Sequence, residues 1–143
     1  MNIIIFGPPG AGKGTQSDFI VSKYSLFQLS TGDLLRDEIK NHSKLGLEID
    51  KIINSGNLVS DEIVKNLVEK IVSNTKYQNR IIFDGYPRNL NQLNNLNSLL
   101  QKYKQKIAAV LNLNVGLEII IKRISGRQVC SKCGSIFNLY FNP

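Results

Sequence analysis

The stretch GPPGAGKGT, Gly7–Thr15, decides the fold. It lies between the apolar run Asn2–Phe6, which has the character of a buried strand, and a helical segment beginning at Lys13. In that context it follows the phosphate-binding pattern G-x-x-x-x-G-K-[ST], whose glycines let backbone N–H groups approach phosphate oxygens beside the lysine ammonium group. One position departs from the pattern: Gly14 stands where a Ser or Thr would ligate Mg²⁺, and the hydroxyl comes one residue later, at Thr15.

Composition sets the outer limits. The chain has 143 residues, of which 42% are hydrophobic and 20% charged, as expected for a single soluble globular domain. It contains no apolar run near the roughly 18 residues that a membrane span needs, and no signal peptide is apparent, so we expect a cytoplasmic location and no membrane partner. The net charge of +7 suits anionic partners but does not choose between nucleotides and nucleic acid.

Strand-like and helical segments alternate along the chain. This order predicts an α/β fold with a mostly parallel sheet flanked by helices. The further strands are expected at Phe27–Ser30, Arg80–Asp84 and Ile107–Leu113. The helices are expected at Lys13–Tyr24, Gly32–Asn41, Leu45–Ile53, a segment capped by Ser60, Leu90–Tyr103 and Leu117–Ile124.

The loop, with Gly-Thr after its lysine, resembles that of the nucleoside monophosphate kinases, and of adenylate kinases in particular. Four further stretches resemble the family in order: STGDLLR at Ser30–Arg36, LVSDEIV at Leu58–Val64, FDGYPRNLNQ at Phe83–Gln92 and RISGRQVCSKCG at Arg123–Gly134. The resemblance, to the bacterial zinc-lid type, implies a P-loop kinase core over residues 1–29 and 60–125. It also implies a helical AMP-binding insert over 30–59 and the start of a lid over 126–143.

The same resemblance implies a reaction, ATP + AMP ⇌ 2 ADP with Mg²⁺, and roles for individual residues. Catalysis is expected from Lys13, Arg88 and Arg123. The ATP-binding residues implied are Gly10, Ala11, Gly12, Lys13, Gly14, Thr15, Arg127, Ile136 and Phe137. The AMP-binding residues implied are Thr31, Arg36, Asn57, Leu58, Val59, Gly85, Tyr86, Pro87, Arg88 and Gln92, with the Gln92 amide pairing with an adenine edge.

Arginine usage supports these roles independently. Phosphoryl transfer needs alignment and charge cancellation, and the planar guanidinium group binds phosphate bidentately. Four of the five arginines fall inside the motifs, namely Arg36, Arg88, Arg123 and Arg127. The fifth, Arg80, starts a predicted strand and is expected to be an ordinary surface residue.

Two metal sites are expected. Asp84 ends a predicted strand, and at that edge of the sheet its carboxylate is assigned to water-mediated Mg²⁺ binding. Cys130 and Cys133 form one C-x2-C pair, which supplies two of the four ligands of a structural zinc site, and the single histidine, His42, lies far away in the sequence. Because the second cysteine pair of the family would follow Pro143, we expect the chain to be a fragment of a longer kinase.

Several alternatives stay open at this point. A UMP/CMP kinase is disfavoured by Thr31, which adenylate kinases favour. A nucleotide-binding fragment without catalysis is possible, and so is a zinc-knuckle nucleic-acid binder, although the sequence shows neither a second knuckle nor interleaved aromatic and basic residues. The partners we expect are ATP, AMP and ADP, with no nucleic acid, and the chain is expected to be a monomer. We also expect weak activity and marginal stability, because the resemblance implies a fifth strand beside Ile107–Leu113, and without it this apolar strand becomes an unpaired sheet edge.

Overall fold

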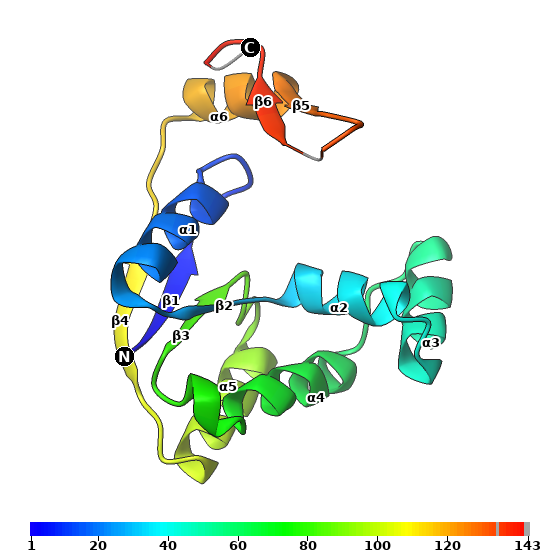
Figure 1. Cartoon of the computed structure of the whole chain (residues 1–143), viewed down its shortest axis with the longest axis vertical. Coiled ribbons are helices and arrows are strands. Elements are labelled where there is room, and N and C mark those ends of the chain that lie inside the picture. The colour runs from blue at the N-terminus through cyan, green and yellow to red at the C-terminus, as the bar shows by residue number, and fades with distance from the viewer. Residues whose placement is uncertain (134, 142–143) are drawn as a thin grey trace.

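The structure is a computed structural model that describes residues 1–133 and 135–141. Its centre is a parallel four-stranded sheet with the order β2-β3-β1-β4, as Figure 1 shows. The strands are β1 (Asn2–Phe6), β2 (Phe27–Ser30), β3 (Ile81–Asp84) and β4 (Ile107–Asn112). The predicted α/β class and the mostly parallel sheet are confirmed.

Burial explains why the central strands are mostly apolar. In β1 and β3, residues such as Ile5, Ile82 and Phe83 are completely buried because helices cover both faces of the sheet. The register pairs Ile4 of β1 with Phe83 of β3 and with Val110 of β4, so the carboxyl ends of these strands meet at one edge.

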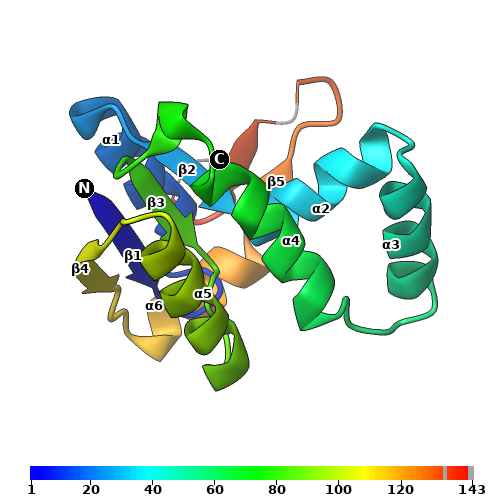
Figure 2. The same cartoon turned by 90° about the horizontal axis from the view of Figure 1, so that it is seen from below.

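Helices from different parts of the chain cover the two faces of the sheet. On one face pack α4 (Asp61–Val72) and α5 (Leu90–Lys102), whose buried side chains join Ile4 and Phe83 in the larger core cluster. On the other face, α1 (Lys13–Tyr24) packs against the smaller cluster around Ile5. Figure 2 shows α4 and α5 together on their side of the sheet.

Two helices project from the sheet beside α4. These are α2 (Thr31–Lys40) and α3 (Lys44–Asn54), which lie against each other away from the strands (Figure 1). Gly46 permits this contact, because a Cβ at that position would lie 1.9 Å from the carbonyl oxygen of Glu38. The expected helices are present here, although α2 begins at Thr31, directly after its cap Ser30.

The last described elements are α6 (Leu117–Ser125) and an antiparallel hairpin of β5 (Arg127–Val129) and β6 (Ile136–Asn138). They lie beyond the phosphate loop and apart from the sheet in Figure 1. Every residue of α6 is at least partly exposed. The hairpin pairs Arg127 with Asn138, so a short lid-like hairpin is formed within the described residues.

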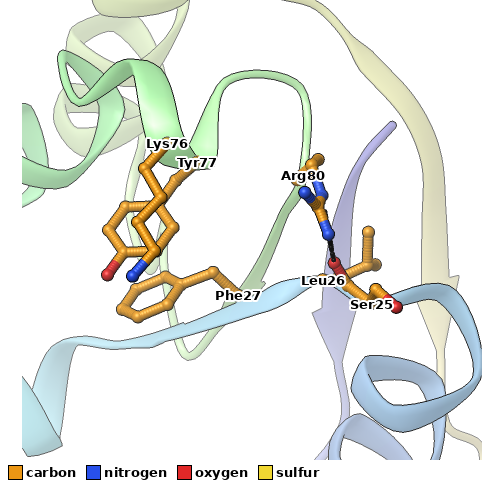
Figure 3. A pocket seen from close by; sticks show the side chains of 6 residues that line it. All are labelled: Ser25, Leu26, Phe27, Lys76, Tyr77 and Arg80. Atoms are coloured by element: carbon orange, nitrogen blue, oxygen red, sulfur yellow. Dashed lines mark hydrogen bonds between the residues drawn. The ribbon is translucent and has the colours of Figure 1, made fainter.

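Arg80 has a structural role that the sequence did not indicate. The expected strand at Arg80–Asp84 begins one residue later, and the short 3-10 helix η1 (Thr75–Tyr77) precedes it. The Arg80 guanidinium group donates hydrogen bonds of 3.1 and 2.7 Å to the carbonyl oxygen of Ser25, the left-handed residue that ends α1. Beside it, Phe27 stacks on Tyr77 at 4.0 Å (Figure 3). Arg80 is exposed, as expected, but it joins α1 to the start of β3.

Candidate active site

The phosphate loop turns through backbone conformations that require glycine. Gly10 and Gly12 have φ angles of 79° and 94°, in the left-handed region, and the Ala11 N–H donates to the carbonyl oxygen of Pro8 at 3.1 Å. Gly12 is the residue before α1, so the loop delivers its N–H groups and the positive end of the helix dipole to the same place. This arrangement is suited to an anionic ligand.

Lys13 lies folded over this loop. Its Nζ donates to the carbonyl oxygens of Gly7 at 2.7 Å and Pro8 at 3.1 Å. An ammonium group carries three donors, so these two bonds hold the charge beside the loop while a further donor direction remains for phosphate.

Arg123 contacts the same loop from α6. Its Nη1 donates to the carbonyl oxygens of Gly10 at 3.3 Å and Ala11 at 3.0 Å. The side chain is half-buried, and it is the polar link between α6 and the glycine-rich turn. Two of the three residues expected to be catalytic, Lys13 and Arg123, are therefore brought together at the loop.

The opposite wall is formed by the turn between β3 and α5. Gly85 has φ 73°, and its carbonyl oxygen accepts from Arg88 Nε at 2.8 Å and from Thr31 Oγ1 at 3.3 Å. Tyr86 and Pro87 follow Gly85 and are buried, with a cis peptide bond between them. Three residues expected to bind AMP, Thr31, Gly85 and Arg88, thus meet at one carbonyl group.

Both walls line a single cleft of about 400 Å³. The cleft lies at the carboxyl ends of β1 and β3, where parallel sheets bind ligands. Its lining residues are Ile5, Phe6, Gly7, Pro9, Lys13, Gly85, Pro87 and Arg88. The lysine of the phosphate loop and the arginine of the second motif therefore face one space, although they are far apart in the sequence.

Gln92 is held by contacts within the protein. Its Nε2 donates to Asp61 Oδ1 at 2.7 Å, and its Oε1 accepts the Arg88 N–H at 2.8 Å. Only 8% of the residue is exposed. The expected pairing of Gln92 with an adenine edge remains a prediction, and Asp61 is a partner that the sequence did not reveal.

The hydroxyl of Tyr86 is the unusual polar group of this wall. The residue is 1% exposed, and within the described part of the chain its hydroxyl has no hydrogen-bond partner. Burial, together with the negative charge of Asp61, raises the pKa of Tyr86 to about 12.

Asp84 is suited to a supporting role toward Mg²⁺. It lies at the carboxyl end of β3, is half-buried, and its Oδ2 accepts from Gln28 Nε2 at 3.1 Å. Among residues 1–133 and 135–141, no cluster of three or more His, Cys, Asp or Glu side chains could hold a metal ion. A single carboxylate with a free oxygen fits a metal held mainly by nucleotide phosphates and water.

Other AMP-side candidates lie outside the cleft lining. Arg36 pairs with Asp33 at 2.5 Å, with 69% of the arginine side chain exposed, and this bond holds the pKa of Asp33 below its usual value. Asn57 donates to Ser55 Oγ, Leu58 is 96% exposed, and Val59 packs partly against the core. The structure does not bring these residues to Arg88, and exposed pairs such as Arg36–Asp33 are weak enough to be exchanged for a phosphate.

The lid candidates are in the hairpin. Arg127 is in β5, and Ile136 and Phe137 are in β6, away from the residues that line the cleft. Cys130 is half-buried and Cys133 exposed; Cys133 Sγ lies 3.1 Å from Ser135 Oγ, whose hydrogen bond lowers the pKa of the Cys133 thiol. Two thiols alone do not complete a zinc site, so zinc remains a prediction.

Sequence reasoning missed Asp61 because its partners are distant in the chain. Asp61 occupies the first turn of α4, where a carboxylate has a sufficient local explanation in the helix dipole. The available signal was the amide-rich segment Asn89–Gln92, whose side chains need acceptors. Nothing in a single sequence pairs that segment with a residue about thirty positions earlier.

These features define a class of protein. A parallel sheet, a glycine-rich loop opening a helix at its carboxyl edge, and cationic side chains on both walls of one cleft are the parts of an α/β phosphotransferase of the P-loop kind. Within the described ranges, none of the helices is both long enough and apolar enough to cross a membrane.

Comparison with known proteins identifies the family. A model of the adenylate kinase family matches residues 5–138. The chain is 56% identical over 142 residues to the adenylate kinase of Pelagibacter ubique, covering 99% of this chain and 67% of that protein. It is 46% identical to that of Fusobacterium nucleatum and 43% identical to that of Fervidobacterium nodosum, covering all of this chain and 68% and 66% of theirs. The chain belongs to the adenylate kinase family.

Family membership confirms the predicted reaction type, phosphoryl transfer between ATP and AMP, which the family carries out with Mg²⁺. None of the comparisons favours a UMP/CMP kinase or a nucleic-acid binder. The chain spans about two thirds of the length of the curated relatives it matches. What this chain does by itself is therefore a separate question.

Proposed function

We propose that this chain binds ATP and AMP on the two walls of the cleft and supports transfer of the γ-phosphoryl group from ATP to AMP, giving two ADP. The observation that carries the proposal is the shared cleft, in which Lys13 of the phosphate loop and Arg88 of the β3–α5 turn face one space. A cation on each wall is what two anionic substrates require if their phosphates are to meet.

On the ATP wall, the N–H groups of Gly10–Thr15 hold the phosphates and Lys13 neutralises the transferred group. Arg123, already at the loop, is well placed to follow the phosphoryl group as it moves, and Arg127 joins it if the hairpin closes. Ile136 and Phe137 are assigned to the ATP adenine.

On the AMP wall, Thr31, Gly85 and Arg88 form the connected group that receives the acceptor phosphate. Arg36 reaches the same phosphate after exchanging Asp33 for it. The remaining residues assigned to AMP are Asn57, Leu58, Val59, Tyr86, Pro87 and Gln92.

The chemistry follows from charge and alignment. The AMP phosphate is already an anionic nucleophile, so no general base is required, and the oxygens that carry negative charge need only be held in line and neutralised. Mg²⁺ supplies charge neutralisation at the ATP phosphates when it is bound, and Asp84 would hold its water ligands. Arg88 supplies a planar pair of donors that a point charge cannot replace.

We also propose a division of the chain into three regions. Residues 1–29 and 60–125 form the core, residues 30–59 the AMP-binding insert, and residues 126–143 the beginning of the lid. The projecting pair α2 and α3, and the separate hairpin β5–β6, support these limits. A monomer in the cytoplasm, with zinc bound only by a completed lid, is the state we propose for the protein.

The direct test is a coupled assay of the purified chain with ATP and AMP, CMP or UMP as acceptor. We expect ADP formation with AMP in preference to the pyrimidine nucleotides, and its loss in Lys13→Met, which keeps the stem but removes the charge. Lys23→Met, at the other end of α1, is the matched control and should retain the rate. Binding of an ATP analogue without any transfer to AMP would instead favour the non-catalytic nucleotide-binding fragment.

A further inference from the structure

Asp61 holds together the polar side chains at the start of α5. Its Oδ1 accepts from Gln92 Nε2 at 2.7 Å, and its Oδ2 accepts from Asn91 Nδ2 at 2.9 Å. Asn89 Nδ2 lies 3.3 and 3.4 Å from the two carboxylate oxygens. Three amide side chains from one end of α5 therefore converge on one carboxylate of α4.

These contacts fix the orientation of the Gln92 amide by chemistry. A carboxylate only accepts hydrogen bonds, so the Gln92 nitrogen must face Asp61; the Arg88 N–H only donates, so the Gln92 oxygen must face Arg88. If the Gln92 amide were reversed, its oxygen would face the Asp61 carboxylate and its N–H groups would face the Arg88 N–H. By fixing this orientation, Asp61 presents the Gln92 side-chain oxygen as the acceptor for the Arg88 backbone N–H.

The Arg88 backbone in turn places the guanidinium group on the cleft wall. Arg88 Nε donates to the Gly85 carbonyl oxygen at 2.8 Å, the same oxygen that accepts from Thr31. Arg88 is thus held at its backbone through Gln92 and at its side chain through Gly85, and only the first of these two links depends on Asp61.

Asp61 also marks the point at which the chain returns from the projecting helices. It is the first residue of α4, directly after the helix cap Ser60 and after the stretch at 57–59 that is assigned to AMP. A movement of α2 and α3 would therefore act on the chain immediately before this carboxylate.

We propose that Asp61 is a positioning residue that orients Arg88 for the acceptor phosphate by fixing the Gln92 amide, and that it couples the end of the 30–59 insert to the phosphate site. This inference rests on the proposed function, because it assumes that Arg88 receives the AMP phosphate. Asp61 is not among the residues that line the cleft, and its effect on Arg88 is assigned to the contact with Gln92.

Two matched controls separate this role from simpler ones. Glu62 follows Asp61 in the same helical turn, is exposed, and shares the favourable position at the helix N-terminus, so Glu62→Ala reports the loss of charge there. Glu69, further along α4, accepts at 2.7 Å from Lys102, the last residue of α5, and at 2.9 Å from Tyr103, the residue that caps it. Glu69→Ala therefore reports the loss of polar contacts between the same two helices.

The experiment measures amide hydrogen exchange at Arg88 by NMR and, in the same samples, the dissociation constants of AMP and of an ATP analogue. In Asp61→Ala we expect exchange at Arg88 to rise about tenfold and the AMP dissociation constant to rise about fivefold or more, as loss of a charge-assisted hydrogen bond implies. The affinity for the ATP analogue should stay within about twofold, and both controls should behave like the original chain. Asp61→Asn, which keeps one acceptor oxygen, should recover part of the loss.

Any other result would contradict a specific part of this proposal. If Arg88 exchange is unchanged in a variant whose β1 and β3 amides remain protected, Asp61 does not position Arg88. If exchange rises but AMP affinity does not fall, or if Glu69→Ala gives the same loss, the role is structural only. A further outcome is that Asp61→Ala raises exchange at Arg88 but the original chain binds no AMP. That result would contradict the proposed function and would still support the positioning of Arg88 by Asp61. If Asp61→Ala loses protection from exchange throughout the sheet, the variant is unfolded. The same measurements on Asp61→Asn then decide between these outcomes.

Discussion

The helices α5 and α6 both follow a strand of the same sheet, yet they are in opposite situations. In α5, Gln92, Leu96, Leu99 and Leu100 are buried against the core, whereas every residue of α6 is at least partly exposed. The exposed apolar side chains of α6 are Leu117, Ile119, Ile121 and Ile124. Both helices have an apolar face, but within the described residues only the apolar face of α5 is buried.

The comparison extends to the two walls of the cleft. The wall that we assign to AMP is held together by contacts among Thr31, Gly85, Arg88, Gln92 and Asp61. Among the described residues, the polar link from α6 to the other wall is one guanidinium group, that of Arg123. An amphipathic pattern therefore indicates where a helix has an apolar face, but not what covers it, and order at a site follows from the contacts made around it.

The largest expected effect concerns the arginines of the two regions. Arg88→Ala should lower the rate of ADP formation by about 10³–10⁵, equivalent to roughly 4–7 kcal/mol. Arg88→Lys should recover only a small part, because it keeps the charge and loses the planar fork. Arg127→Ala, in the exposed hairpin, should cost less, and steady-state assays of the three variants compare them directly.

If Arg88→Ala and Arg127→Ala lowered the rate of ADP formation equally, the difference that we expect between the ordered wall at Arg88 and the exposed hairpin would be contradicted. A nearly unchanged rate in Arg88→Lys would show that bidentate geometry is not the reason for an arginine at this position.

The next largest effect is expected on self-association, through the exposed apolar side chains of β4 and α6. Within the described residues β4 has one neighbour, β1, and its Val110 is 57% exposed, so the molecule has an apolar sheet edge in addition to the exposed apolar side chains of α6. The monomer that we propose should hold at low concentration, and we expect these exposed side chains to drive self-association as the concentration rises. Val110→Lys with Ile121→Lys should reduce that association, since burying each such side chain is worth about 1.5–3 kcal/mol. Sedimentation at several concentrations measures this.

The matched control is Leu90→Lys, which charges an exposed leucine at the start of α5, outside β4 and α6. If all three chains are monomeric at the same concentrations, the exposed face of β4 and α6 does not drive association.

A smaller effect is expected at the contact between α2 and α3. Gly46→Ala would place a methyl group 1.9 Å from the Glu38 carbonyl oxygen, so the helices must separate. Overpacking of this kind costs about 1–3 kcal/mol, and thermal unfolding should show the loss. Gly116→Ala, where a Cβ has nothing within 4 Å and φ is −59°, is the control without overpacking. It loses only the preference for glycine at a helix N-cap and should cost at most about 1 kcal/mol. A Gly46→Ala variant as stable as this control would disprove the close contact.

The smallest effect concerns Tyr86. Because its buried hydroxyl has no partner in the described residues, Tyr86→Phe should leave stability at pH 7 unchanged or raise it by about 1 kcal/mol. The pKa of Tyr86 is raised from 10.0 to about 12, so the neutral form stabilises the fold below pH 10. That contribution, at most about 2–3 kcal/mol, is lost as the pH rises from 10 to 12.

Denaturant unfolding of both chains at pH 7 and across pH 10–12 measures this difference. Tyr86→Phe should lose less stability over the alkaline range than the original chain. A destabilised phenylalanine variant at pH 7 would mean that the hydroxyl makes a useful hydrogen bond.

Local signals predicted most of the fold. The bounds of β1, α1 and β2 are those expected, because a short apolar run, a glycine-rich turn and an amphipathic helix are each specified by adjacent residues. The 3-10 helix η1 was not expected, because its short run of Thr, Lys and Tyr has no periodicity to detect. Ser60 as the cap of α4 was expected, and its hydroxyl accepts the Ile63 N–H.

Long-range polar contacts could not be predicted in the same way. Asn2 and Gln105 are both buried and bonded to each other at 3.1 Å, and Gln105 also donates to the Val72 carbonyl oxygen, linking the start of the sheet to the end of α4. Their positions near element ends predict exposure instead. The candidate site divides similarly: motifs identified Lys13 and Arg88, but only the fold shows that they share a cleft and that Asp61 lies behind Arg88.

The most direct measurement is a titration of the isotopically labelled chain with AMP and, separately, with an ATP analogue, followed by backbone NMR. The account predicts that AMP shifts Thr31, Gly85 and Arg88, that the analogue shifts Gly10–Thr15, and that the two sets of shifts appear together when both nucleotides are present. Competition of AMP and the analogue for the phosphate loop alone, with Gly85 and Arg88 unaffected by either nucleotide, would contradict it.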